Sequence, residues 1–213
     1  TACDDSGLMM AMIRREYDIS IGLDHPHIAN VFTFEENTVV GPCIVMEYVD
    51  GRNLTEFLRE NPSMSSRRRI AGQLMDAVGY LHRKGVIHND LKPENILISR
   101  TDNSVRLLDF GLSDTDAYYL ARTMGCTAEY ASPELLRHES VDSRSDIYSL
   151  GIVMYRLLNN NKDPFINSNK TIIKEADNET ALKKRMDGEP LPKLKGINKN
   201  FKGFFQFLLS FSS

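Results

Sequence analysis

Residues 85–99 have the sequence GVIHNDLKPENILIS, a polar segment that runs into a short apolar one. Asp90, Lys92 and Asn95 lie close together in it, directly before the apolar run 96–98. A carboxylate accepts hydrogen bonds from a hydroxyl, a lysine brings a cation, and an amide oxygen is a hard ligand suited to Mg²⁺. A loop of this length can direct all three side chains toward one ligand. A polar loop between a helix and a strand is the alternative for any three-residue piece of the pattern.

A second candidate oxygen ligand follows at Leu108-Asp109-Phe110-Gly111. On its own, Asp-Phe-Gly is a common tripeptide and is usually a strand followed by a turn. The Asp109 carboxylate is a second hard oxygen ligand beside the amide oxygen of Asn95, and an all-oxygen Mg²⁺ site uses ligands of this type.

The motif HNDLKPEN at residues 88–95, followed by DFG at 109–111, resembles the catalytic loop and metal-binding motif of protein kinases. The resemblance extends from about Glu16 to Leu158, and more weakly to the end of the chain. It implies that Asp90 orients the attacking hydroxyl and that Lys92 faces the transferring phosphoryl group. It also implies that the Mg²⁺ accompanying ATP is held by Asn95 and Asp109.

Residues 125–134, GCTAEYASPE, resemble the end of a kinase activation segment, with Ser-Pro-Glu in place of the usual Ala-Pro-Glu. Thr127 matches the threonine that meets the catalytic Asp and Lys in Ser/Thr kinases, and together with Lys92 it favours Ser/Thr over Tyr specificity. Thr123 stands where a phosphorylated threonine often lies. Glu134 matches the glutamate that pairs with a late arginine of the family, which this sequence does not contain.

The resemblance also implies a structural residue and an ATP pocket. Asp146, in SDIYSLG, matches the buried aspartate that braces the catalytic-loop backbone. Residues 45–51, VMEYVDG, resemble the hinge between lobes, although an edge strand leading into a turn is the alternative. The implied nucleotide contacts are Met46 as gatekeeper, the backbone of Glu47 and Val49 at the adenine edge, Leu97 beneath the adenine, Asn53 at the ribose, and Glu16 as the helix glutamate that pairs with a phosphate-binding lysine.

Three departures from the family pattern stand out. No glycine-rich phosphate loop and no lysine precede Glu16, and we expect the chain to be part of a longer protein. Asn89 replaces the arginine that normally binds a phosphorylated activation segment, so activity is predicted not to depend on Thr123 phosphorylation through that contact. Ser20 occupies a position that is usually apolar, and the small hydroxyl is expected to loosen the helix that carries Glu16.

The pattern of elements predicts an α+β fold. The resemblance implies that it is a protein-kinase-like bilobal fold with a partial N-terminal β lobe and a mainly helical C-terminal lobe. The predicted parts are residues 1–46, a hinge at 47–51, and a catalytic lobe at 52–213. Helices are expected at 9–23, 54–59, 65–83, 147–158, 179–186 and 200–209. Strands are expected at 31–34 and 39–49 around a turn at 35–38, with a hairpin at 96–98 and 105–108 and a loop at 159–180.

Composition constrains the partners. The 213 residues carry a net charge of −3, which favours neither a nucleic-acid nor an anionic-membrane partner. Three widely spaced cysteines fit a reducing compartment, so a cytoplasmic protein is expected. No apolar run is long enough to span a bilayer.

The interpretation that follows is a Ser/Thr protein kinase that transfers the γ-phosphoryl group of Mg-ATP to a protein hydroxyl. A truncated pseudokinase or binding scaffold without phosphoryl transfer is the alternative. A small-molecule kinase with a similar catalytic loop is a third possibility, disfavoured by the Asp-Phe-Gly motif and the Ser-Pro-Glu segment.

Overall fold

An amphipathic helix and a largely buried helix form the centre of the molecule. The computed structural model describes residues 2–39, 41–109, 129–137, 139–159, 161–166, 172–190 and 192. In it, α3 (Met64–Arg83) begins after the N-cap Ser63 and presents one buried face, as its helical periodicity predicts. The second helix, α6 (Ser143–Leu158), is buried on nearly all sides. It begins four residues before the predicted start, because the Asp142 side chain caps its first turn.

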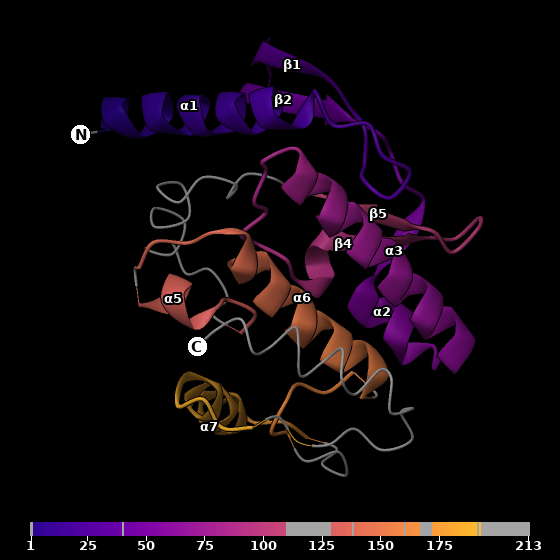
Figure 1. The fold of residues 1–213 in the computed structure, drawn as a ribbon. Helices are drawn as coiled ribbons and strands as arrows, with labels where there is room; N and C mark the ends of the chain where they lie inside the picture. The colour runs from indigo at the N-terminus through magenta and orange to yellow at the C-terminus, as the bar shows by residue number, and fades with distance from the viewer. Residues whose placement is uncertain are drawn as a thin grey trace.

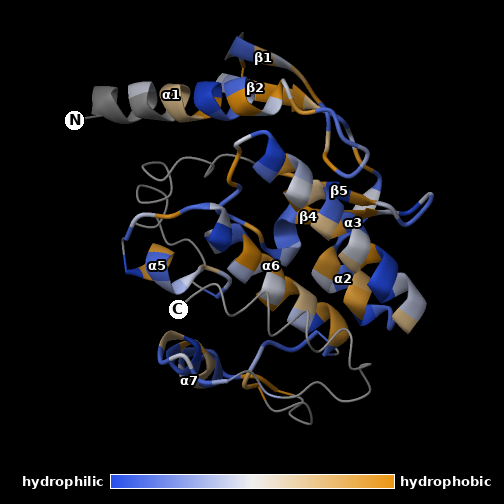
Figure 2. Cartoon of the chain, viewed as in Figure 1, coloured by the Kyte–Doolittle hydropathy of each residue, from blue (hydrophilic) through white to orange (hydrophobic). Residues whose placement is uncertain are grey.

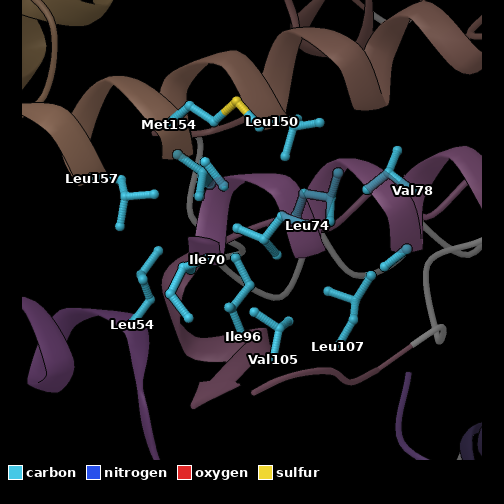
Figure 3. Close-up of a cluster of buried hydrophobic side chains, with 14 of the residues drawn as sticks. Leu54, Ile70, Leu74, Val78, Ile96, Val105, Leu107, Leu150, Met154 and Leu157 are labelled. Atoms are coloured by element: carbon cyan, nitrogen blue, oxygen red, sulfur yellow. The ribbon is translucent and has the colours of Figure 1, made fainter. Parts of the chain in front are cut away.

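The core lies in two layers around α3. Figure 3 shows α6 packed on one side of α3 and a β-hairpin on the other. The predicted hairpin is confirmed: β4 (Ile96–Ser99) pairs antiparallel with β5 (Val105–Leu107). The short strand β3 (Gly51–Asn53) completes the sheet in the order β3-β4-β5. Apolar side chains that are fully buried in this core include Leu54, Ile70, Leu74, Ile96, Ile98, Val105, Leu107, Ile152, Met154 and Leu157.

The sheet is tied directly to the loop that precedes it. The 3₁₀ helix η1 (Pro93–Asn95) runs into β4 without a connecting turn. The predicted short helix α2 (Leu54–Arg59) follows β3, and Asn53 caps it in a reciprocal capping box with Glu56. Because β3 pairs with β4, residues 51–59 and 93–107 lie together on one side of α3.

A smaller layer lies apart from this body and contains α1 (Ala2–Ser20), β1 (Val31–Thr38) and β2 (Gly41–Met46) (Figure 1). The strands pair antiparallel, and Tyr17 of α1 packs against Phe34 of β1 with ring centroids 5.8 Å apart. Residues 21–30 and 47–50 connect the layer to the body. The arrangement is α+β, with a small strand-bearing layer beside a mainly helical body.

Two predictions for this layer were wrong in their boundaries. The turn predicted at 35–38 lies after Thr38 instead, since β1 continues through a bulge to Thr38 and Gly41 takes the positive φ of 91° that starts β2. The helix predicted at 9–23 runs from Ala2 to Ser20, and Leu23 is already a loop residue whose amide bonds to the Ser20 carbonyl.

The C-terminal part contains α5 (Pro133–Leu136) and α7 (Glu175–Met186). The loop predicted at 159–180 was wrong in its second half, because α7 begins at Glu175, where Asp177 accepts the Lys174 amide hydrogen at 2.8 Å. Figure 2 shows that α7 is mostly polar, and only Ala181 and Arg185 of it are buried. The helix predicted at 200–209 lies outside the described residues. Among the described helices, none combines the length and apolar character needed to cross a bilayer.

Candidate active site

A buried carboxylate holds the centre of the catalytic-loop sequence. Asp146, near the start of α6, is 0% exposed. Its Oδ1 accepts the Asn89 amide hydrogen at 2.9 Å, and its Oδ2 accepts the His88 amide hydrogen at 2.9 Å. Oδ2 also lies 2.8 Å from Nε2 of His82, at the end of α3. A carboxylate out of water needs several donors, and these three hold two consecutive backbone amides of the loop in place.

The backbone turns sharply at Asn89, whose φ is 62°. Asparagine is one of the few residues other than glycine that adopts this left-handed conformation readily. On either side of the turn, Nδ1 of His88 accepts the Asp90 amide hydrogen at 3.3 Å. That leaves Nε2 of His88 as the protonated nitrogen, and it donates to the Leu108 carbonyl at 3.1 Å. The fully buried His88 ring therefore connects the loop to the segment that carries Asp109.

Asp90, Lys92 and Asn95 converge on one another. Nζ of Lys92 lies 2.5 Å from Oδ2 of Asp90, and Nδ2 of Asn95 donates to the same oxygen at 2.9 Å and to the Asp90 carbonyl at 3.0 Å. Burial raises the pKa of the Asp90 carboxyl, while Lys92 and Asn95 act in the opposite direction by stabilising its charged form. Both donors use Oδ2, so Oδ1 is the oxygen directed away from this internal network.

The two predicted metal ligands are brought together by the backbone. The Leu108 amide donates to the Asn95 carbonyl at 2.9 Å, and Asp109 is the next residue. Asp109 lies two residues after the end of β5 with a positive φ of 66°, and its side chain is exposed. Because Nδ2 of Asn95 is bound to Asp90, its Oδ1 is the remaining ligand atom. An amide oxygen and one carboxylate fit Mg²⁺, which typically takes one or two such ligands plus phosphate oxygens.

The predicted adenine and ribose residues lie along β2, the segment that follows it, β3 and β4. Met46 ends β2, and the Glu47 amide donates to the Asn30 carbonyl at 2.7 Å. The Glu47 carboxylate joins Nε of Arg106 at 3.2 Å and the Asn30 amide at 3.2 Å, which ties this segment to β5. Val49 follows, half-buried.

Asn53 and Leu97 are cross-strand partners in the β3–β4 pair. Oδ1 of Asn53 accepts the Glu56 amide hydrogen at 2.9 Å, and Glu56 returns a contact to the Asn53 amide at 3.1 Å. Capping α2 therefore accounts for asparagine at this position without a ligand. Leu97 is half-buried, on the opposite face of β4 from the fully buried Ile96 and Ile98.

Glu16 and Glu134 lie outside the catalytic loop. Glu16 is half-buried on α1, and its carbonyl accepts the hydroxyl of Ser20 at 2.6 Å. Ser20 is itself 3% exposed, so its hydroxyl is satisfied within the last turn of the helix. Oε1 of Glu134 accepts the Ser145 hydroxyl at 2.8 Å, which links α5 to the start of α6. Thr123 and Thr127 lie outside the described residues.

Sequence reasoning missed two residues that shape the site, His82 and Arg106. The signal for His82 is its position four residues after the buried Val78, on the inward face of α3. Arg106 is the outward residue between two buried neighbours in β5, as strand alternation indicates. Nothing in the sequence names Asp146 or Glu47 as their partners, which are 64 and 59 residues away.

Comparison with known proteins identifies the family. The family described as "Protein kinase domain" matches residues 4–213. The chain is 42% identical over 163 residues to the serine/threonine-protein kinase PknB of Mycobacterium leprae, covering 72% of this chain and 26% of that protein. Identity to PknB of Mycolicibacterium smegmatis is 43% over 164 residues, covering 72% and 26%. For the probable serine/threonine-protein kinase PknB of Bifidobacterium longum it is 37% over 166 residues, covering 71% and 24%.

The chain spans about a quarter of the length of the curated relatives it matches. The match to the family nevertheless covers almost all of its residues, including the catalytic loop and the segment that carries Asp109. With the α+β arrangement described above, the chain belongs to the protein kinase domain family and has part of the bilobal fold of that family.

Proposed function

We propose that this chain is the catalytic domain of a Ser/Thr protein kinase that transfers the γ-phosphoryl group of ATP to a protein hydroxyl. The observation that carries the proposal is the convergence of Lys92 and Asn95 on Oδ2 of Asp90, at 2.5 Å and 2.9 Å. A polar loop between a helix and a strand has no need to gather a cation, an amide and a half-buried carboxylate. The curated relatives named above support the same activity.

Each side chain has a role in this reaction. We assign Oδ1 of Asp90 to the substrate hydroxyl, because both internal donors use Oδ2. The hydrogen bond to Asp90 orients that hydroxyl for attack, and Lys92 neutralises charge on the transferring phosphoryl group. Asn95 and Asp109 would hold Mg²⁺, which when bound offsets the negative charge of the ATP phosphates. Asp146 acts through the backbone of His88 and Asn89, so it is a positioning residue.

The nucleotide would bind between the two parts of the chain. We propose a partial N-terminal lobe at 1–46, a hinge at 47–51 and a catalytic lobe at 52–213. Met46 would limit the back of the adenine pocket, with the adenine edge bound by backbone groups of Glu47 and Val49. The remaining proposed contacts are Leu97 beneath the adenine, Asn53 at the ribose and Glu16 toward a phosphate-binding lysine.

The proposed partner is a protein with an accessible Ser or Thr. Thr127 would approach Asp90 and Lys92 during transfer, and Thr123 and Glu134 would belong to the activation segment and its support. A cytoplasmic location completes the proposal, because the three cysteines are too few and too scattered for a disulfide framework.

The test is transfer of labelled γ-phosphate from Mg-ATP to a Ser/Thr-rich protein such as casein. Asp90→Asn should keep the shape of the site and lower the rate by about 10²–10⁴-fold, because it removes the acceptor for the substrate hydroxyl. Asp187→Asn is the matched control, since its exposed side chain lies after α7 and outside the site. Equal rates in the wild type and Asp90→Asn would refute the proposal. Nucleotide binding without transfer in the wild type would favour a scaffold instead.

A further inference from the structure

Two histidines lie where the small layer meets the body. Residues 21–30 connect α1 to β1, and the rings of His25 and His27 in this junction lie 5.6 Å apart, edge to face. His25 also packs on the ring of Tyr80 from α3, with centroids 4.9 Å apart, and its Nε2 lies 3.4 Å from Oδ2 of Asp76. Nδ1 of His25 accepts the His27 amide hydrogen at 3.2 Å. The junction therefore contacts α3 through the ring of His25, against which the ring of His27 packs.

Burial lowers the pKa of His27, which favours the neutral ring. Its Nδ1 is buried and, among the described residues, has no hydrogen-bond partner. The charged ring carries a proton on both nitrogens, so the proton on Nδ1 would have no acceptor. Leaving such a charge unpaired away from water is costly.

The charges that face His27 are mixed. Arg106 of β5 and His25 of the junction disfavour a positive ring, whereas Asp76 of α3 favours one. Arg106 is committed elsewhere, to the Glu47 carboxylate at 3.2 Å and to the Pro26 carbonyl at 2.6 Å. Lys84 adds a further cation beyond His25, with Nζ 5.6 Å from the Tyr80 ring centroid. The Val105 backbone also favours the charged ring, and burial is the largest effect and outweighs both it and Asp76.

The backbone around His27 is bonded to β5. The Leu107 amide donates to the His27 carbonyl at 2.9 Å, and the Ala29 amide donates to the Leu107 carbonyl at 3.0 Å. Ile28, between them, is 1% exposed in the main core. Leu107 is two residues before Asp109, so the contacts of the junction support the strand that leads to the candidate metal ligand.

We propose that His27 makes the docking of the 21–30 junction onto α3 and β5 sensitive to protons, with the undocked junction taking up a proton that the docked junction excludes. Burial is the main cause that lowers the pKa of His27 from 6.5 in the docked state. The lowered pKa of the docked ring determines how docking depends on pH. Docking is at full strength above pH 6.5, weakens as the pH falls through 6.5, and levels off below the lowered pKa of the docked ring.

The consequence for catalysis rests on the proposed function, whereas the docking change itself does not. Undocking would free the connection between α1, which carries Glu16, and the strand that leads to Asp109. Acidification would then separate the two halves of the candidate ATP site without altering any residue that touches the substrate.

The test is hydrogen–deuterium exchange of the whole chain between pH 7.5 and 5, corrected for the intrinsic pH dependence of exchange. The reporters are the Ala29 and Leu107 amides, with the Leu74 amide inside α3 as an internal reference. In the wild type, opening at the two reporters should increase by up to about tenfold per pH unit below 6.5. In His27→Gln, which keeps a polar side chain of similar size but does not titrate, the opening should not depend on pH.

Two further measurements complete the test. His25→Gln should keep most of the pH dependence; its loss in this variant, with His27→Gln unaffected, would assign the proton to His25 and overturn the proposal. Identical pH slopes in the wild type and His27→Gln would also overturn it. If His27→Gln does not fold, NMR titration of the His27 ring in the wild type decides, because a midpoint at or above 6.5 contradicts the proposal.

Discussion

Replacing Asp146 by asparagine tests the support of the catalytic loop directly. The carboxylate is fully buried and accepts from three donors: the amides of His88 and Asn89, and the ring of His82. Asparagine has the same shape but one oxygen instead of two. In its better orientation the amide oxygen stays near His88 and His82, and the new NH₂ group faces the Asn89 amide, donor against donor.

The expected loss can be estimated from these contacts. One buried amide hydrogen is left without an acceptor, and the two remaining hydrogen bonds lose the charge of their acceptor, which together cost about 3 kcal/mol of unfolding free energy. With a urea m-value of about 2–3 kcal/mol per molar, the unfolding midpoint should fall by about 1–1.5 M.

The assay is equilibrium urea unfolding of the full chain, with Asp50→Asn as the control. Asp50 is 70% exposed and pairs with Arg100 only at 3.8 Å, so its loss should stay below about 0.5 kcal/mol. A midpoint for Asp146→Asn no lower than that of Asp50→Asn would refute the reasoning. Full phosphoryl transfer by folded Asp146→Asn would likewise contradict its positioning role.

Three further predictions follow from single residues. Thr123→Ala should retain phosphoryl transfer, because Asn89 has no charge with which to bind a phosphate; loss of transfer with rescue by Thr123→Glu would contradict this. Leu74→Ala should cost about 2–5 kcal/mol in urea unfolding because its side chain is fully buried, whereas Met64→Ala, at an exposed site, should cost far less. Hydrogen bonds from Ser104 lower the pKa of Asp102 to about 2, so its contribution to stability is present above pH 3.8 and is lost as the pH falls toward 2. Asp102→Asn should remove that part of the acid dependence, and an unchanged acid-unfolding profile would count against it.

Local patterns predicted the body of the molecule well. Helical spacing located α3, and two apolar runs around a polar turn located the β4–β5 hairpin. Both signals depend on neighbours a few residues apart, which a sequence displays directly. Boundaries set by a single capping or turn contact were less accurate: α6 and α7 begin earlier than predicted, and the first hairpin turns after Thr38.

The chemical groups of the catalytic loop are evident from the sequence, since Asp90, Lys92 and Asn95 fall within one short contiguous segment. How these groups are held and joined to the rest of the site depends on tertiary contacts. His82 meets Asp146 across 64 residues, and Arg106 meets Glu47 across 59. Such contacts form only when packing of the core closes long segments of chain, so their partners cannot be assigned from local spacing. The docking of His27 is of the same kind, because its buried nitrogen results from the approach of β5 and α3.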